Sequence, residues 1–264
     1  MKKSVTLLTA LLLLPSLFGI NSFAKNSFLN KNSIENGVVG VTYQKEEDNI
    51  RYKVAISKGS EIYYYDYSGP GTEFYPLQLG NGEYKISLLK NISESKYMVV
   101  HSDIVQVKLE NENVVYLQSI QNVSYEPGMN AVLKAEELMN GKINTLDKVK
   151  AVYQYIVSNI EYDYKFAQLL DKPHIPDIEK TYNTQKGICY DFAALFAAML
   201  RSQGIPVKLV KGYSNNIEGY HAWNEVLIDG SWVTIDTTYD VTMKGFKKIN
   251  MIKDKLEYQP ERYY

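Results

Sequence analysis

Short runs of apolar residues, set between polar turn sequences, predict β-strands over the first part of the chain. The runs are rich in β-branched and aromatic residues, and turns such as Lys58-Gly59 and Gly80-Asn81-Gly82 separate them. This spacing is typical of an antiparallel sandwich or barrel. The expected strands are residues 38–43, 50–56, 62–67, 84–89 and 104–109. We therefore expect residues 25–126 to form a small all-β, sandwich-like N-terminal module.

Tyrosines gather in one of these runs, at Tyr63, Tyr64, Tyr65 and Tyr67. Such a cluster can form an aromatic binding surface, but alternating tyrosines on a half-exposed strand usually fill the core of their own sheet. We expect the second, structural role.

After Pro127 the apolar positions recur at helical spacing. One helix is expected over residues 131–139, with Gly141 ending it. A second is expected over residues 146–160, with Thr145 as its N-cap. Residues 163–186 contain two prolines and no lasting periodicity, so we expect an irregular surface connection there.

A third apolar stripe follows Cys189 and ends before Gly204-Ile205-Pro206. Its members are spaced as one face of a buried helix: Phe192, Leu195, Phe196, Met199 and Leu200. Cys189 therefore opens a helix. A short strand over residues 207–211 comes next.

The sequence Asp229-Gly230 predicts a tight hairpin between strands at residues 221–228 and 231–238. If these two residues form the turn, paired residue numbers sum to 459. His221 and Asp236 are then diagonal neighbours on one face, with about 7 Å between the backbones of their two strands, and Trp223 shares that face. A three-residue turn would instead place His221 and Asp236 on opposite faces.

Composition narrows the class of protein. The chain has 264 residues, of which 45% are hydrophobic, so it can bury a sizeable core. A net charge of -1 gives no basis for nucleic-acid binding. The single cysteine excludes a disulfide framework within the chain and a zinc site built on several thiolates.

The first 24 residues resemble a secretory signal peptide. Lys2 and Lys3 precede an apolar run, and Ser22-Phe23-Ala24 places small residues at a cleavage site. A retained membrane anchor is the competing interpretation, although Pro15 and the short length of the run weaken it. We expect a secreted or cell-surface protein that has no membrane contact after cleavage. In such a compartment, a lone cysteine indicates either pairing between molecules or a reactive thiol.

The position of Cys189 at a helix start favours a reactive thiol. First-turn amides and the helix dipole stabilise a thiolate, whereas a lone buried cysteine is otherwise a small hydrophobe. His221 and Asp236 supply a base and its orienting carboxylate, which completes the arrangement of acyl-transfer catalysis. The Cys189 amide would bind the oxyanion with a second donor, for which Gln185, Tyr190 or another tyrosine are candidates. Trp223 would shield the imidazole, wall the substrate groove or simply fill the core.

The sequence resembles the transglutaminase-like domain over about residues 130–241. Three blocks carry the likeness: Gly187-Ile188-Cys189-Tyr190-Asp191, His221-Ala222-Trp223-Asn224-Glu225-Val226 and Trp232-Val233-Thr234-Ile235-Asp236-Thr237-Thr238. The resemblance implies an α+β fold for residues 127–264, with a nucleophile helix packed on an antiparallel sheet as in papain-like enzymes. It implies Cys189 as nucleophile, His221 as base and Asp236 as orienting acid. The family includes protein cross-linkers, peptidases, amidases and inactive members.

The other histidines and aspartates are weaker candidates for roles in the site. His101 and His174 have no spaced partner, and Asp191 and Asp240 fit the orienting role less well than Asp236. No metal motif is present in the sequence, and we expect no cofactor. The expected partner is a protein or peptide, with cell-wall peptide as one option, and the oligomeric state stays open. The rival hypothesis is a non-catalytic surface binding or assembly protein with a vestigial triad.

Overall fold

The computed structural model describes residues 28–47, 49–69, 71–171, 173–246 and 249–264. The predicted signal peptide, residues 1–24, lies outside these ranges. Among the described residues, no helix is both long enough and apolar enough to span a membrane.

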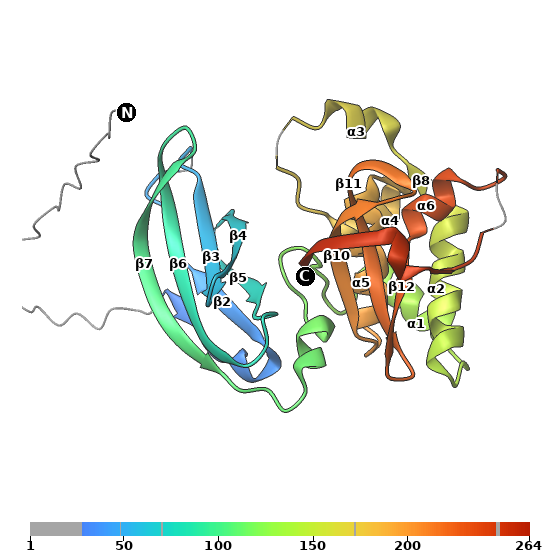
Figure 1. The fold of residues 1–264 in the computed structure, drawn as a ribbon, viewed down its shortest axis with the longest axis horizontal. Coiled ribbons are helices and arrows are strands. Elements are labelled where there is room, and N and C mark those ends of the chain that lie inside the picture. The colour runs from blue at the N-terminus through green and yellow to red at the C-terminus, as the bar shows by residue number, and fades with distance from the viewer. Residues whose placement is uncertain (1–27, 48, 70, 172, 247–248) are drawn as a thin grey trace, which may run out of the picture.

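The N-terminal half consists of two antiparallel sheets that share one core (Figure 1). The first sheet has the order β1-β2-β5, and the second has the order β4-β3-β6-β7. Their bounds are β1 (Leu29–Asn30), β2 (Val38–Thr42), β3 (Tyr52–Lys58), β4 (Glu61–Tyr67), β5 (Thr72–Pro76), β6 (Gly82–Ser93) and β7 (Lys96–Val107). The predicted sandwich-like arrangement is confirmed.

Strand β4 places its tyrosines on alternate faces. Tyr63, Tyr65 and Tyr67 are buried in the core of the module, whereas Tyr64 is 58% exposed. Three of the four tyrosines therefore have the predicted structural role. The sequence pattern missed β1, β5 and residues 96–103 of β7. Strand β5 follows a glycine-rich turn and ends at Pro76, so the run is too short to stand out from the turns beside it.

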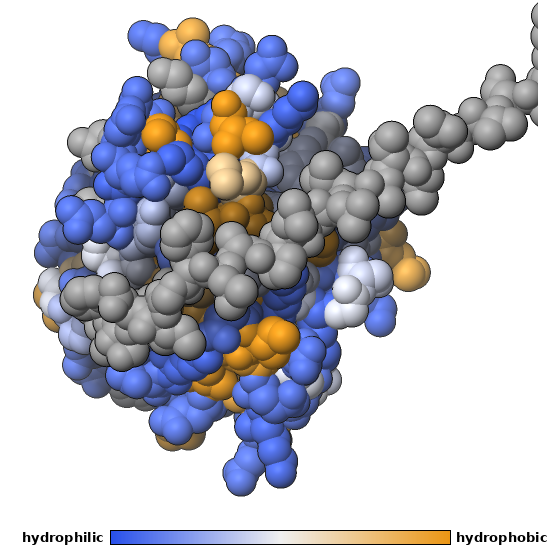
Figure 2. Space-filling model, turned by 90° about the vertical axis from the view of Figure 1, so that its left-hand side faces the viewer, coloured by the Kyte–Doolittle hydropathy of each residue, from blue (hydrophilic) through white to orange (hydrophobic). Residues whose placement is uncertain are grey.

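The side of the module on which β7 lies is mostly hydrophilic (Figure 2). Where grey atoms do not cover it, apolar residues form small separate areas among charged and polar ones. Single exposed apolar residues of this kind are normal on a protein surface.

The second half is a five-stranded antiparallel sheet covered by helices (Figure 1). The sheet order is β13-β12-β11-β10-β14. Its strands are β10 (Val207–Ser214), β11 (Ile217–Ile228), β12 (Ser231–Ile235), β13 (Ile252–Lys253) and β14 (Tyr258–Tyr263). The helices are α1 (Asn130–Met139), α2 (Thr145–Asn159), α3 (Tyr164–Leu169), α4 (Ile178–Thr184), α5 (Cys189–Arg201) and α6 (Thr237–Thr242). The α+β class is therefore confirmed.

Helix α5 is the centre of this half. Every residue from Tyr190 to Arg201 is buried, because the helix packs on β10 and β11 on one side and on α1, α2 and α4 on the other. A helix that is apolar on all its faces is stable only in such a position.

The helices predicted before α5 need two corrections. Asn144, and not Thr145, caps α2, since its side-chain oxygen accepts a hydrogen bond of 2.8 Å from the Asp147 amide. The predicted irregular connection at residues 163–186 contains α3 and α4, followed by the short strand β9 (Lys186–Gly187), which pairs with β8 (Glu161–Tyr162). Asp163 and Asp177 cap the two helices, which are too short to show a lasting period.

Gly212 lets β14 and β11 approach β10 closely. A Cβ atom at this position would lie 2.1 Å from the Gln259 carbonyl oxygen of β14 and 3.0 Å from the Trp223 ring of β11. Because Gly212 has no side chain, β14 can pair with β10 at the edge of the sheet, where Tyr258 reaches the site described below.

The buried Arg201 at the end of α5 joins three segments of the chain. It is 2% exposed, and its guanidinium donates hydrogen bonds of 2.7–2.9 Å to the carbonyl oxygens of Val207, Gln118 and Tyr264. Burial lowers the pKa of Arg201 to about 10, while Tyr125 and Tyr116 act in the opposite direction. The group therefore stays charged at neutral pH.

Arg201→Met should destabilise the fold by about 3 kcal/mol, because buried carbonyl oxygens lose their donors. Urea unfolding followed by circular dichroism measures the change, and Arg262→Met, at a partly exposed arginine of β14, is the control. A loss below about 1 kcal/mol for Arg201→Met would show that these hydrogen bonds do not hold the segments together.

Candidate active site

Cys189 is the first residue of α5 and is half-buried at one end of a cavity. The start of the helix is fixed by Asp191, whose carboxylate accepts a hydrogen bond of 2.9 Å from the Ile188 amide. Gly187 leaves room for this contact, since a Cβ atom there would lie 2.6 Å from the Asp191 Cβ. The first-turn amides have no partners within the helix and favour negative charge on the thiol.

The hairpin of β11 and β12 has the predicted register. Ile228 pairs with Ser231 and Asn224 pairs with Ile235, so the numbers sum to 459 as expected. Asp229 and Gly230 both have positive φ, at 49° and 81°, as a two-residue turn requires. The predicted second strand, residues 231–238, is too long, because β12 ends at Ile235.

Asp236 is the N-cap of α6, and its Oδ1 accepts a hydrogen bond of 2.9 Å from the Tyr239 amide. Its other oxygen, Oδ2, lies 2.9 Å from Nε2 of His221. Tyr258 of β14 donates its hydroxyl proton to the same oxygen at 3.1 Å. The carboxylate is 0% exposed, so these three donors compensate its lost hydration.

The thiol of Cys189 acts on His221 and favours its protonated form. Since Nε2 faces Asp236, the nitrogen available to the thiol is Nδ1. Burial lowers the pKa of His221, but the interactions with Asp236 and Cys189 outweigh it and raise this pKa to about 9. The structure therefore brings the three residues together as a thiol, an imidazole and a buried carboxylate.

Trp223 forms the wall behind His221. The two rings stack with centroids 6.2 Å apart, and Tyr258 lies on the same indole at 5.0 Å. Trp223 is 1% exposed and does not line the cavity. Of the roles considered for it, shielding the imidazole fits this position.

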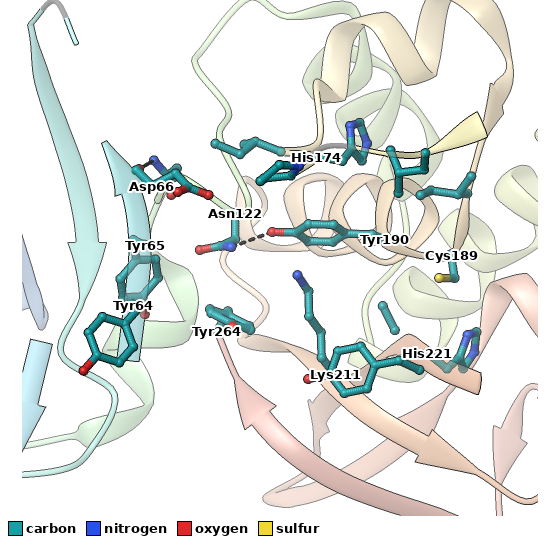
Figure 3. A pocket seen from close by; sticks show the side chains of 17 residues that line it. Tyr64, Tyr65, Asp66, Asn122, His174, Cys189, Tyr190, Lys211, His221 and Tyr264 are labelled. Carbon is teal, nitrogen blue, oxygen red and sulfur yellow. Dashed lines mark hydrogen bonds between the residues drawn. The ribbon is translucent and has the colours of Figure 1, made fainter. Parts of the chain in front are cut away.

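The thiol opens into a cavity of about 410 Å³ between the two halves of the chain (Figure 3). Cavities that hold small ligands measure about 300–1,000 Å³. Strand β4 contributes Tyr64, Tyr65 and Asp66 to one wall, and His221 and Lys211 contribute to the opposite one. A site between the two halves can hold a segment of a peptide.

The candidates for oxyanion binding lie in different places. Gln185 is exposed, caps the end of α4 and forms a side-chain hydrogen bond with Tyr155, so it is not among the residues that line the cavity. Tyr190 does line it, and its hydroxyl oxygen accepts a hydrogen bond of 2.5 Å from Asn122. Burial raises the pKa of Tyr190 well above its usual value.

Several residues of this site were missed in the sequence. Tyr258 lies far along the chain from the hairpin, and no pattern connects the two. His174, which showed no spaced partner, lies 2.6 Å from Asp191 and lines the cavity. Lys211 also lines it, although in the sequence it resembles any polar residue of an alternating strand. Asp240 binds Tyr153 and Lys253 instead of His221.

The described residues contain no group of three or more histidine, cysteine, aspartate or glutamate side chains that could hold a metal ion.

The raised pKa of His221 predicts a pH-dependent stability. Between the ordinary pKa of 6.5 and about 9, the folded chain binds more protons at this residue than the unfolded chain does. The interaction of protonated His221 with Asp236 should therefore stabilise the fold by roughly 3 kcal/mol below pH 6.5. This contribution should be lost as the pH rises to about 9. Asp236→Asn should remove most of this fall in the free energy of unfolding, whereas His101→Asn should not. Identical pH profiles for the chain and Asp236→Asn would contradict the assignment.

Comparison with known proteins shows that part of the chain is similar to one family. A family model described as the transglutaminase-like superfamily matches residues 134–237. The chain is 31% identical over 132 residues to kyphoscoliosis peptidase of Mus musculus, a match that covers 46% of this chain and 19% of that protein. It is 32% identical over 126 residues to the uncharacterized protein YebA of Bacillus subtilis (strain 168), covering 39% of this chain and 16% of that protein. The matches thus span about a fifth or less of these relatives.

Among solved structures, the chain is similar to a proposed cysteine protease from Cytophaga hutchinsonii. The TM-score is 0.44 at 18% identity, and the alignment covers 79% of this chain and 73% of the other. The family match includes α5, β10, β11 and β12, the elements that carry Cys189 and His221. Residues 134–237, which are built as a helix packed on an antiparallel sheet, thus match the model of the transglutaminase-like superfamily.

Proposed function

We propose that the chain is an exported cysteine enzyme that cleaves or transfers acyl groups at amide bonds of a protein or peptide. The observation that carries this proposal is that Cys189 and His221 line one peptide-sized cavity together, with the imidazole hydrogen-bonded to the buried carboxylate of Asp236. An intact arrangement of this kind favours catalysis over the rival hypothesis of a binding protein with a vestigial triad.

Before the first half of the reaction, the Cys189 thiol gives its proton to Nδ1 of His221, because the raised pKa of the imidazole favours the imidazolium at neutral pH. The thiolate attacks the amide carbonyl carbon and forms a tetrahedral oxyanion. The Cys189 amide and the other free amides of the first turn of α5 stabilise this oxyanion. The imidazolium then gives its proton to the leaving nitrogen, the carbon–nitrogen bond breaks, and a thioester on Cys189 is left.

In the second half, His221 takes a proton from water or from an acceptor amine, which attacks the thioester. When the carbon–sulfur bond breaks, the thiolate leaves and His221 keeps the proton, which restores the starting pair. Asp236 holds the ring so that Nδ1 faces sulfur throughout, and Trp223 keeps water from the imidazole–carboxylate pair. The chemistry is the same for hydrolysis and for transfer, so access of water to the cavity decides between them.

Two further parts of the proposal rest on the sequence and on relatives. Export rests on the signal-like segment at residues 1–24, and it makes surface proteins and cell-wall peptides available as substrates. The peptidase named among the relatives gives support for hydrolysis.

Iodoacetamide should alkylate Cys189 readily well below pH 8, because the helix start and His221 favour the thiolate. His221→Ala should slow the alkylation at neutral pH at least about tenfold, and His101→Ala, at a histidine of the N-terminal module, should not change it. Mass spectrometry of the intact chain gives the rates. A folded chain whose thiol is inert at every pH would overturn the mechanism.

When the chain is incubated with a glutamine-containing protein and a fluorescent amine, a product should form. The Cys189→Ala variant should not form this product. Cleaved peptide assigns a hydrolase, and label incorporated into the protein assigns a transferase. Trapping the acyl group on Cys189 and measuring its mass by mass spectrometry identifies the substrate. Product formation that persists in Cys189→Ala would show that this thiol does not carry the reaction.

A further inference from the structure

Lys211 carries a positive charge into the cavity from β10. Its ammonium lies 3.3 Å from the centre of the Tyr190 ring and 5.3 Å from that of Tyr264. Figure 3 shows the amine pointing toward Tyr190 and Asn122, on the side of the cavity away from the Cys189 sulfur. The ammonium is therefore placed to contact a substrate beside the reacting carbonyl.

No ion pair holds this ammonium within the part of the chain that the structure describes. Lys208, on the same strand, differs in this respect because it pairs with Glu225 at 3.5 Å. Among the described residues that line the cavity, the single acidic side chain is Asp66, and it pairs with Lys53 at 2.8 Å. The aromatic rings are the contacts that the structure provides for the Lys211 charge.

The positive charge of Lys211 is therefore only partly compensated by the groups around it. Burial lowers the pKa of Lys211 to about 8, and the nearby Cys189 acts in the opposite direction. The group is still charged at neutral pH, and a partly desolvated cation gains most from an anion with oxygen acceptors. Aromatic rings supply a weaker attraction than a carboxylate does.

Asn122, at the same end of the cavity, provides a second polar group whose interactions are incomplete. Its amide nitrogen donates to the Tyr190 hydroxyl, but its Oδ1 is buried and has no hydrogen-bond partner. Asn122 is 7% exposed. A buried acceptor without a donor points to a ligand group that supplies an N–H.

We propose that Lys211 and Asn122 form a subsite for a carboxylate next to an amide N–H, so that the cavity takes acylated amino acids or peptides bearing a carboxylate close to the scissile bond. This inference rests on the proposed function for the reaction and adds the class of substrate. The carboxylate comes either from the end of a peptide or from an acidic side chain, since both present the same two oxygens.

The rates of alkylation by iodoacetate and iodoacetamide test the subsite, because the two reagents differ in the carboxylate. The iodoacetate-to-iodoacetamide ratio cancels changes in the reactivity of the thiol. We expect Lys211→Met to lower this ratio about tenfold at neutral pH, and Lys211→Arg to keep it within about threefold. Lys208→Met removes the same charge from the same strand outside the cavity and should leave the ratio unchanged.

Binding to Cys189→Ala tests the subsite without any reaction. The probes are acetyl-dialanine as free acid, the same peptide as amide, and acetyl-alanyl-glutamate amide, measured by calorimetry. Tighter binding of the free acid than of its amide assigns a peptide end, and tighter binding of the glutamate peptide than of the dialanine amide assigns an acidic side chain. Adding Lys211→Met should remove either preference, and Lys211→Gln serves the same purpose if the methionine variant does not fold.

Equal binding of all three probes, or a preference that survives without Lys211, would overturn the subsite. An inert thiol together with a Lys211-dependent preference would overturn the proposed function and leave the subsite standing. The two proposals therefore fail separately.

Discussion

The buried carboxylate of Asp236 is the group around which the site is built. A charge that is fully removed from water must be matched by donors, and here they come from three elements that are far apart in the sequence. His221 lies on β11, Tyr258 on β14, and the Tyr239 amide in the first turn of α6. The requirement to satisfy one anion thus fixes the edge strand, the hairpin and the following helix together, and it orients the imidazole.

Strand β14 connects this site to the N-terminal module. Tyr258 at its start contacts Asp236, while at its far end the Tyr263 amide donates to the Tyr63 hydroxyl. Tyr264 then packs edge-on against Tyr63 and Tyr65. Gly212 is the position on β10 that admits the strand. One strand therefore contacts both the buried carboxylate and the N-terminal module.

Local rules in the sequence determine the helix that Cys189 opens and the hairpin register, and both could be predicted. An Asp-Gly turn fixes which residues face each other, so His221 and Asp236 could be placed on one side. Tertiary packing decides the rest. Tyr258 reaches Asp236 only because β14 adds to β10, and His174 meets Asp191 only because a loop folds back on α5. Neither contact has a sequence spacing that could reveal it. Gln185, which ends α4 with a left-handed backbone, is not among the residues that line the cavity.

The cavity is lined by residues from both halves of the chain, so changes in one half can leave the other unaltered. Cys189 and His221 lie in the segment that matches the transglutaminase-like superfamily, whereas Tyr64 and Asp66 lie on β4 of the β module. Mutations in that strand can reshape what enters the cavity without moving Cys189 or His221. The shape of the cavity and the arrangement of Cys189, His221 and Asp236 are therefore set by different parts of the sequence.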